Sequence, residues 1–304
     1  INDSSTDNTS KILKNFGGNI LVVNTLKNMG NKSHAQEYGL QFIDGDILVT
    51  VDADSLLAPN FIEIVENDFK DPKIKAVAGY IKSLKHNWIT ACRELDYIIG
   101  QNMHKRAQAN INSVIVIPGC AGAFRLKSFN KFATFEHDTL TEDLDFTYKF
   151  HENAQNIKFN MNAVVYTQDP VTLKAYTNQM RRWIAGGWQN IIKHWRIILK
   201  KPGHALEIGL MYFEGVVFGF LFFILPIINI TYFFTFIVSY YAFAVVLGLY
   251  ASYKRRRFDL LVFTFAFPFV MILNSWIFLE QFIKEVILRR KNLVWFKPER
   301  VELI

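Results

Sequence analysis

Cysteine is scarce in this chain: its 304 residues include only Cys92 and Cys120. Two such cysteines provide neither a disulfide framework nor a metal-binding spacing, which excludes disulfide-rich scaffolds and cysteine-based zinc modules and is compatible with a reducing compartment. The sequence also shows no initiator methionine and no signal peptide, since it begins at Ile1-Asn2-Asp3.

Apolar residues are too frequent for an ordinary soluble protein. The mean hydropathy is +0.12, and aromatic residues make up 15% of the chain, with 28 phenylalanines. The first two-thirds resembles a soluble domain, whereas the last third is dense in Phe, Ile and Leu. About 20 apolar residues cross a bilayer, so we expect spans at about 208–228, 230–253 and 260–282. Glu214 within the first span is a candidate either for function or for structural pairing.

The net charge of +7 raises the question of nucleic-acid binding, but the positions of the basic residues argue against it. They flank apolar segments, as at cytoplasmic membrane borders: Lys193, Arg196, Lys200 and Lys201, then 254–257, then 289–291. A single span between the last two groups places them on opposite sides of the membrane. Alternatively, Pro268 breaks the third segment into a re-entrant hairpin. The sequence leaves both topologies open.

An apolar strand predicted over 46–51 ends at Asp52-Ala53-Asp54. Ligands of open α/β sheets bind at the carboxyl ends of strands, and two carboxylates one residue apart suit a hard divalent cation. The alternative is a simple turn. Further strands are predicted at 20–23, 76–80, 114–117 and 163–166, and the strand at 114–117 leads into a turn of small residues. Helices are predicted at 60–67 and 88–107, the latter with a solvated charged face.

Two further patterns precede the apolar third. Thr141-Glu142-Asp143 is typical of a helix N-terminus, with a capping hydroxyl and two acids in the first turn. A basic, tryptophan-bearing amphipathic helix is predicted from Gln179 to Trp195, and such helices lie in membrane interfaces. Its apolar stripe consists of Trp188, Ile191, Ile192, Trp195, Ile198 and Leu199.

Asp52-Ala53-Asp54, Thr141-Glu142-Asp143 and Gln179-Met180-Arg181-Arg182-Trp183 occur in the order found in one family. The chain resembles, over nearly its whole length, the processive membrane-embedded family-2 glycosyltransferases, which include cellulose, hyaluronan, chitin and poly-N-acetylglucosamine synthases. The resemblance implies an α/β fold: a GT-A-type nucleotide-sugar transferase domain with a mostly parallel sheet, then interfacial helices and an α-helical transmembrane bundle. The stretches 139–143 and 182–187 look most like bacterial poly-N-acetylglucosamine synthases.

On the donor side, the resemblance implies that Asp3 contacts the nucleotide base, in a turn where the family's usual glycine is Ser4. Lys32 approaches the nucleotide or its phosphates, Asp52 lies near the ribose or nucleotide, and Asp54 ligates Mg2+ or Mn2+. A lysine at a helix start is also commonly just solvated. The chain resembles a fragment that lacks the family's first strand-helix unit.

On the acceptor side, the resemblance implies that Asp143 is the catalytic base and that Glu142 helps to orient the site. The small-residue turn containing Gly119 and Gly122 lines the acceptor pocket; a tight bend is the plainer explanation, and Cys120 there contributes shape only. The basic-aromatic motif supplies three more substrate contacts: Gln179 for the acceptor, Arg182 for the diphosphate and Trp183 for sugar stacking.

We therefore expect a catalytic domain at 1–170, an interfacial region at 171–205, membrane segments at 206–283 and a basic tail at 284–304. The tail, 294–300, resembles the family's terminal W-x-K-x-x-R. The expected reaction is inverting transfer from a UDP-sugar to a growing β-linked polysaccharide. The expected setting is a multi-pass plasma-membrane protein with a cytoplasmic catalytic domain, an accessory membrane subunit and no nucleic acid. The alternatives are a lipid-linked glycosyltransferase of the ceramide glucosyltransferase type and a catalytically silent polysaccharide-binding membrane protein.

Overall fold

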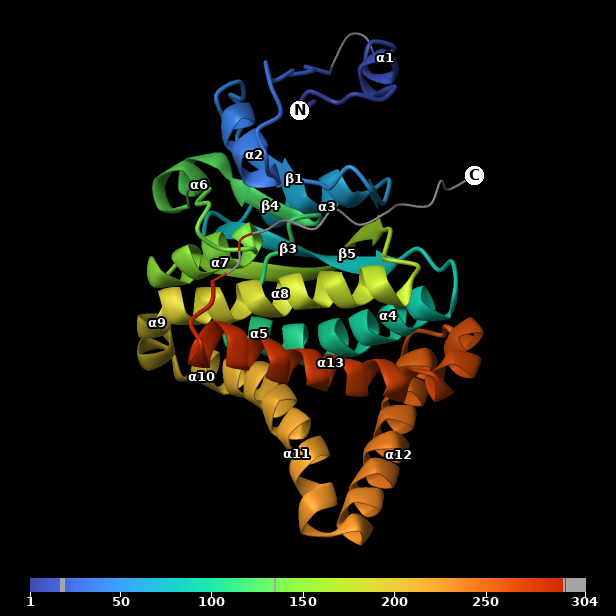
Figure 1. Cartoon of the computed structure of the whole chain (residues 1–304). Coiled ribbons are helices and arrows are strands. Elements are labelled where there is room, and N and C mark those ends of the chain that lie inside the picture. Colours follow the sequence, from blue (N-terminus) through green and yellow to red (C-terminus); the bar gives the residue numbers. More distant parts are fainter. Residues whose placement is uncertain (17–19, 134, 292, 294–304) are drawn as a thin grey trace.

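The computed structural model describes the chain except for residues 17–19, 134, 292 and 294–304, so the tail motif at 294–300 lies outside the described residues. An α/β domain forms the upper part of Figure 1. Below it, α11 (Glu214–Ile228) and α12 (Ile230–Lys254) meet at a tip and diverge toward the domain. Between them and the domain, α13 (Phe267–Gln281) packs along α8 (Leu173–Lys193).

The α/β domain is built on a five-stranded sheet of order β1-β4-β3-β5-β2. Of its four described pairings only β3 with β5 is parallel, so the expectation of a mostly parallel sheet was wrong. Strands β1, β3 and β5 run in one direction, and β2 and β4 run in the other. A turn in which Asp52 O accepts from Ser55 N reverses the chain between β1 and β2. The strands are β1 (Ile47–Thr50), β2 (Ser55–Leu57), β3 (Ile74–Ser83), β4 (Gly122–Arg125) and β5 (Asn156–Thr167).

Two predicted strands do not join this sheet. In segment 20–23, Ile20 and Leu21 are exposed, and the neighbouring pairing is an isolated bridge between Asn2 and Asn24. Segment 114–117 is buried and extended, but its backbone is bonded by side chains of flanking helices. Gln108 accepts from Ile115 N and Thr147 accepts from Ile117 N, so no strand partner is needed there.

Helices cover both faces of the sheet. An aromatic cluster of Phe124, Phe129, Phe146 and Phe150 packs β4, α6 and α7 together and so fixes the N-terminus of α7 near the sheet. The helices of the domain are α1 (Thr9–Leu13), α2 (Lys32–Leu40), α3 (Phe61–Asp68), α4 (Trp88–Ile99), α5 (Arg106–Asn110), α6 (Leu126–Phe132), α7 (Glu142–Glu152), α8 and α9 (Trp195–Lys200).

The long helix predicted over 88–107 exists, with a π-helical stretch, Gly100–Lys105, joining α4 to α5. Its predicted solvated face was wrong at Arg93 and Glu94, which are 3% and 2% exposed. Each is paired across an element boundary, Arg93 with Asp169 and Glu94 with Arg257. Buried charges require such partners, and partners distant in sequence leave no local pattern.

The predicted interfacial stripe is split rather than continuous. Helix α8 ends at Lys193 and α9 begins at Trp195, so the helical phase does not continue across the break. Trp188 and Ile191 are buried in the core, whereas Trp195 and Leu199 are exposed.

Two helices are long and apolar enough to cross a membrane, namely Pro202–Ile228 and Ile230–Lys254. The first runs continuously through α10 (Pro202–Ile208), the π-helical Gly209–Phe213 and α11. A third candidate passes only as the pair Phe258–Phe265 and Phe267–Ile287, which is bent by 60° next to Pro268. The described part of the chain thus offers two spans, or three if that bent pair counts as one.

Candidate active site

The Asp-Ala-Asp turn lies where β1 ends and β2 begins. Lys32, at the start of α2, donates to Oδ1 of Asp52 and lies 3.5 Å from Oε1 of Glu142. Asn31 places this lysine by capping α2, since its side chain accepts from His34 N at 2.9 Å. Burial alone would lower the pKa of Lys32, but Glu142, Asp52 and Asp143 outweigh it and raise the pKa. An ammonium ion is therefore held among carboxylates from two elements.

Asp143, in the first turn of α7, is the most strongly perturbed acid of this group. Burial, followed by the charge of Glu142, raises the pKa of Asp143 to about 6, against the opposing effects of Lys32, the Gly119 amide and Arg182. The Gly119 N–H donates to Oδ2 of Asp143 at 3.3 Å. A carboxyl group poised near neutrality in this way suits general-base chemistry.

The two glycines of the small-residue turn have different surroundings. A Cβ at Gly119 would lie 2.9 Å from Nζ of Lys32, so a larger residue there would displace that ammonium group. Gly122 instead lies in β4, where a Cβ would meet Thr50 Oγ1 at 2.9 Å and Ile117 at 3.0 Å. Gly119 lines the cavity described below, and Gly122 is not among its described lining residues. The structure therefore gives Gly122 a packing role between strands.

Helix α8 brings the basic-aromatic motif to the same place. Arg182 Nη1 donates to the carbonyl of Leu140 at 3.4 Å, beside Thr141-Glu142-Asp143. The ring of Trp183 faces Arg93, whose Cζ lies 5.0 Å from the ring centroid. Gln179 is 7% exposed, and its Oε1 has no hydrogen-bond partner among the described residues. Gln179 is therefore a buried polar residue of the cavity wall whose amide oxygen has no described donor.

One cavity of about 1990 Å³ connects these groups. It continues past α8 to the membrane-type helices, where its wall includes Glu214, Phe218, Phe243 and Phe267. Of the eleven residues predicted to be catalytic, substrate-binding or metal-ligating, ten line it: Asp3, Lys32, Asp52, Asp54, Gly119, Glu142, Asp143, Gln179, Arg182 and Trp183.

The N-terminal turn also contributes to the cavity wall. Asp3 Oδ1 accepts from Thr25 Oγ1 and from the Met29 amide, both at 2.9 Å. Ser4 has a φ of +51°, the left-handed region that glycine favours. The turn thus adopts that conformation with a serine.

Cys120 lies in the same wall. Burial raises the pKa of its thiol, so the group stays protonated and is not a nucleophile.

Sequence reasoning missed a connected group of polar residues in the wall of this cavity, namely Arg93, Asp96, Tyr97 and Asp169. A sequence pattern could have indicated Asp169, because this residue closely follows β5 and so lies beside the carboxyl end of that strand. The three residues on α4 pair with one another along the helix, but nothing local places them at the cavity, where Arg93 and Tyr97 meet Asp169 and Arg93 meets Trp183.

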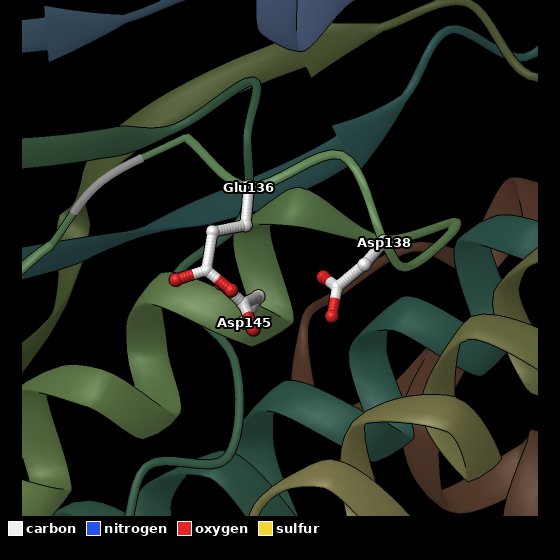
Figure 2. Close-up of side chains that lie close together, drawn as sticks. All are labelled: Glu136, Asp138 and Asp145. Atoms are coloured by element: carbon white, nitrogen blue, oxygen red, sulfur yellow. The ribbon is translucent and has the colours of Figure 1, made fainter.

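A second acidic group lies near the site. Figure 2 shows Glu136 and Asp138, on the loop before α7, close to Asp145 of α7. Lys193 pairs with all three, at 2.8 Å for Asp138 and 2.6 Å for Asp145. Burial alone would raise the pKa of Asp145, but hydrogen bonds from His194, Lys149 and Lys193 lower it well below its usual range. Protein cations already neutralise this cluster, which ties the loop to α7 and α8.

Residues 47–279 match the family described as Glycosyl transferase family group 2. Two curated relatives are poly-beta-1,6-N-acetyl-D-glucosamine synthases. The one from Staphylococcus aureus strain COL is 26% identical over 223 residues, covering 71% of this chain and 53% of that protein. The one from Staphylococcus epidermidis is 24% identical over 273 residues, covering 88% and 62%. The chain therefore spans roughly half to three-fifths of the length of these relatives.

Among solved structures, the fold is similar to that of a mannosyltransferase from Pyrobaculum calidifontis in complex with GDP-Man and Mn2+. The TM-score is 0.61 at 16% identity, covering 95% of this chain and 77% of that one. The likeness at that identity concerns the fold alone, and it identifies the mixed sheet as GT-A-like. The match to the family model covers more than half of the sequence, and this chain therefore belongs to Glycosyl transferase family group 2.

Proposed function

We propose that the chain carries out inverting transfer of a sugar from a UDP-sugar to a growing β-linked polysaccharide at a membrane. The observation that carries the proposal is the single cavity that joins the Asp-Ala-Asp turn, Asp143 and the α8 motif and then continues to α11 and α13. Poly-N-acetylglucosamine synthases among the relatives favour N-acetylglucosamine as the sugar, with glucose as the other candidate.

In this proposal Asp143 is the base. It takes the proton from the acceptor hydroxyl as that oxygen attacks the anomeric carbon, while the UDP leaves from the opposite face. The Gly119 amide holds the carboxyl group in place; burial, and after it the charge of Glu142, raises its pKa against the charge of Lys32. One carboxylate suffices, because inversion needs no covalent intermediate.

The leaving diphosphate needs positive charge. Arg182 suits it because its planar group donates to two oxygens at once, and Lys32 adds a point charge. Lys32 pairs with Asp52 and Glu142, and we propose that donor binding draws it toward the phosphates. Asp3 and Asp52 then face the nucleoside.

The carboxylates of the Asp-Ala-Asp turn fit a hard divalent cation. Oxygen ligands at the end of a strand, facing a cavity wide enough for a nucleotide, are what Mg2+ or Mn2+ binds. Asp54 would hold the ion, which when bound neutralises charge on the diphosphate.

We further propose the division into a catalytic part (1–170), a connecting helical part (171–205), membrane segments (206–283) and a basic tail (284–304). The catalytic part lies on the cytoplasmic side of the plasma membrane. The described spans number two or three, so we propose that accessory membrane helices from a partner subunit complete the path for the polymer.

The apolar part of the cavity supports a second candidate, transfer to a lipid. Phe218 of α11, Phe243 of α12 and Phe267 of α13 line it, and a hydrocarbon chain would fit such a wall. In that case the enzyme adds one sugar per lipid.

Purified membranes containing the protein, offered a panel of radiolabelled UDP-sugars, test the proposal. We expect UDP release and an aqueous product of high mass that a linkage-specific β-hydrolase degrades. Label found only in an organic-extractable monoglycosylated lipid would establish the second candidate. Absence of UDP release with every donor would defeat both and favour a silent binding protein.

A further inference from the structure

Arg93 is 3% exposed in the wall of the cavity, although arginine is rarely buried without partners. Its Nη1 lies 2.5 Å from Asp96 Oδ2 on the same helix, and its Nε lies 3.6 Å from Asp169 Oδ1. The hydroxyl of Tyr97 donates to that same Asp169 oxygen at 3.1 Å. The guanidinium is thus anchored both to α4 and to the segment that follows β5.

Aromatic rings contact the same guanidinium. Its Cζ lies 4.4 Å from the ring centroid of Tyr97 on α4 and 5.0 Å from that of Trp183 on α8. The ring centroid of Tyr176, which precedes Trp183 on α8, lies 5.9 Å from the same Cζ. The Tyr176 hydroxyl donates to Asn274 of α13. A cation within about 6 Å of a ring face is attracted to it, and more strongly where water is excluded. Arg93 therefore links the indole of Trp183 to a rigid, charge-paired cluster.

Trp183 itself is only half-buried and lines the cavity, so part of its ring is accessible to a ligand. We propose that Arg93 is a positioning residue of the acceptor site, holding the indole of Trp183 in the orientation on which an acceptor sugar stacks. The inference rests on the function proposed above. The acceptor hydroxyl must reach Asp143 within hydrogen-bond distance, and small misplacements of a bound reactant cost large factors in rate.

The test uses transfer of one radiolabelled sugar to a soluble β-linked oligosaccharide. Arg93→Lys keeps a positive charge for Asp96 and Asp169 but loses the planar group. We expect the kcat/KM for the acceptor to fall about tenfold because the acceptor KM rises. A change of this size corresponds to the loss of a cation–ring contact. The donor KM and the rate of donor hydrolysis should stay within about twofold. Arg106→Lys, an exposed arginine in the same helical stretch, is the matched control and should change neither.

A double-mutant cycle separates positioning from a general structural effect. In a Trp183→Ala background, Arg93→Lys should lower the acceptor kcat/KM by less than about twofold, since the ring through which it acts is gone. A full loss in that background, or no loss in Arg93→Lys alone, would overturn the inference.

If Arg93→Lys does not fold, Tyr97→Leu replaces it in the double-mutant cycle with Trp183→Ala. The Tyr97→Leu substitution leaves the two carboxylate pairings of Arg93 intact. We expect a smaller loss of acceptor kcat/KM that again disappears in the Trp183→Ala background, and an additive loss would overturn the inference. A wild type that hydrolyses donor but transfers to no saccharide would refute the proposed function, and the positioning role with it.

Discussion

Arg257, just beyond the end of α12, lies 2.9 Å from Glu94, which is buried on α4. Beside this pair, Lys85 and Asp259 are joined at 3.0 Å. The chain that leaves α12 is therefore bound directly to the α/β domain. At the other end of the hairpin, α10 packs against α5 of the same domain. Both ends of the α11–α12 hairpin thus lie on the domain's side, and so does the basic group 254–257.

This arrangement bears on the topology that the sequence left open. Helix α13 lies against α8 and follows the 60° bend next to Pro268. If that bent pair does not cross the membrane, the basic groups at 254–257 and 289–291 lie on one side, and the conflict between them disappears. Labelling of single cysteines on intact vesicles would decide this directly.

Loss of the Arg257–Glu94 pair should destabilise the folded protein. Arg257→Ala leaves a buried carboxyl group without its cation, and we expect a loss of about 1 to 3 kcal/mol, measured by thermal unfolding in detergent. Burial raises the pKa of Glu94 to about 7, so the loss should be larger at pH 8.5, where Glu94 is ionised, than at pH 6. Arg256→Ala, the exposed neighbour, is the control. Equal effects of the two variants would contradict the assignment.

Replacement of the proposed base should remove transfer without removing donor binding. We expect Asp143→Asn to lower kcat by on the order of 100-fold or more, because the base acts on the acceptor hydroxyl. Affinity for UDP-sugar, measured by calorimetry, should stay close to that of the wild type. A variant that retains half of its turnover would rule out the role.

The pH profile should report the same carboxyl group. Asp143 must be deprotonated to act, and its pKa is raised to about 6, so kcat/KM should fall as the pH drops through about 6. Glu142→Gln removes the adjacent negative charge, which lowers the pKa of Asp143 and shifts the midpoint to lower pH. An unchanged or higher midpoint in Glu142→Gln would argue against this coupling.

Removal of the proposed metal ligand should mimic removal of the metal. Asp54→Ala should abolish turnover and weaken UDP binding, because the ion at the diphosphate loses its anchor. Chelator added to the wild type should have the same effect, reversed by Mg2+ or Mn2+. Full wild-type activity in excess chelator would reduce the Asp-Ala-Asp turn to a structural element.

Trp183→Ala should shorten or abolish the polymer. Stacking on an aromatic face contributes about a kcal/mol, which helps to keep the terminal sugar bound between additions. Residual UDP release should then reflect hydrolysis of the donor. The measurement is the size distribution of radiolabelled product, and an unchanged distribution would show that Trp183 does not hold the acceptor.

Local patterns were sufficient to predict the strand and the helices that carry the polar residues of the site. A strand ending in Asp-Ala-Asp, a helix beginning at Glu142-Asp143 and apolar stretches of membrane length are each visible within a few residues, because secondary structure and helix termini depend on near neighbours. The sequence by itself thus determined the strand β1, the helices α7 and α8, and the helices of spanning length.

Tertiary structure alone decided which of these groups meet and how. Gly122 packs between strands rather than against the cavity, and Arg93 is buried beneath Trp183 rather than solvated. Asp145 of α7 binds Lys193 and His194. In each case the partner comes from an element far away in the sequence, and the free energy of burying a charge or a small residue depends on that partner. No pattern along the chain encodes such a contact, which forms only when the sheet and helices pack.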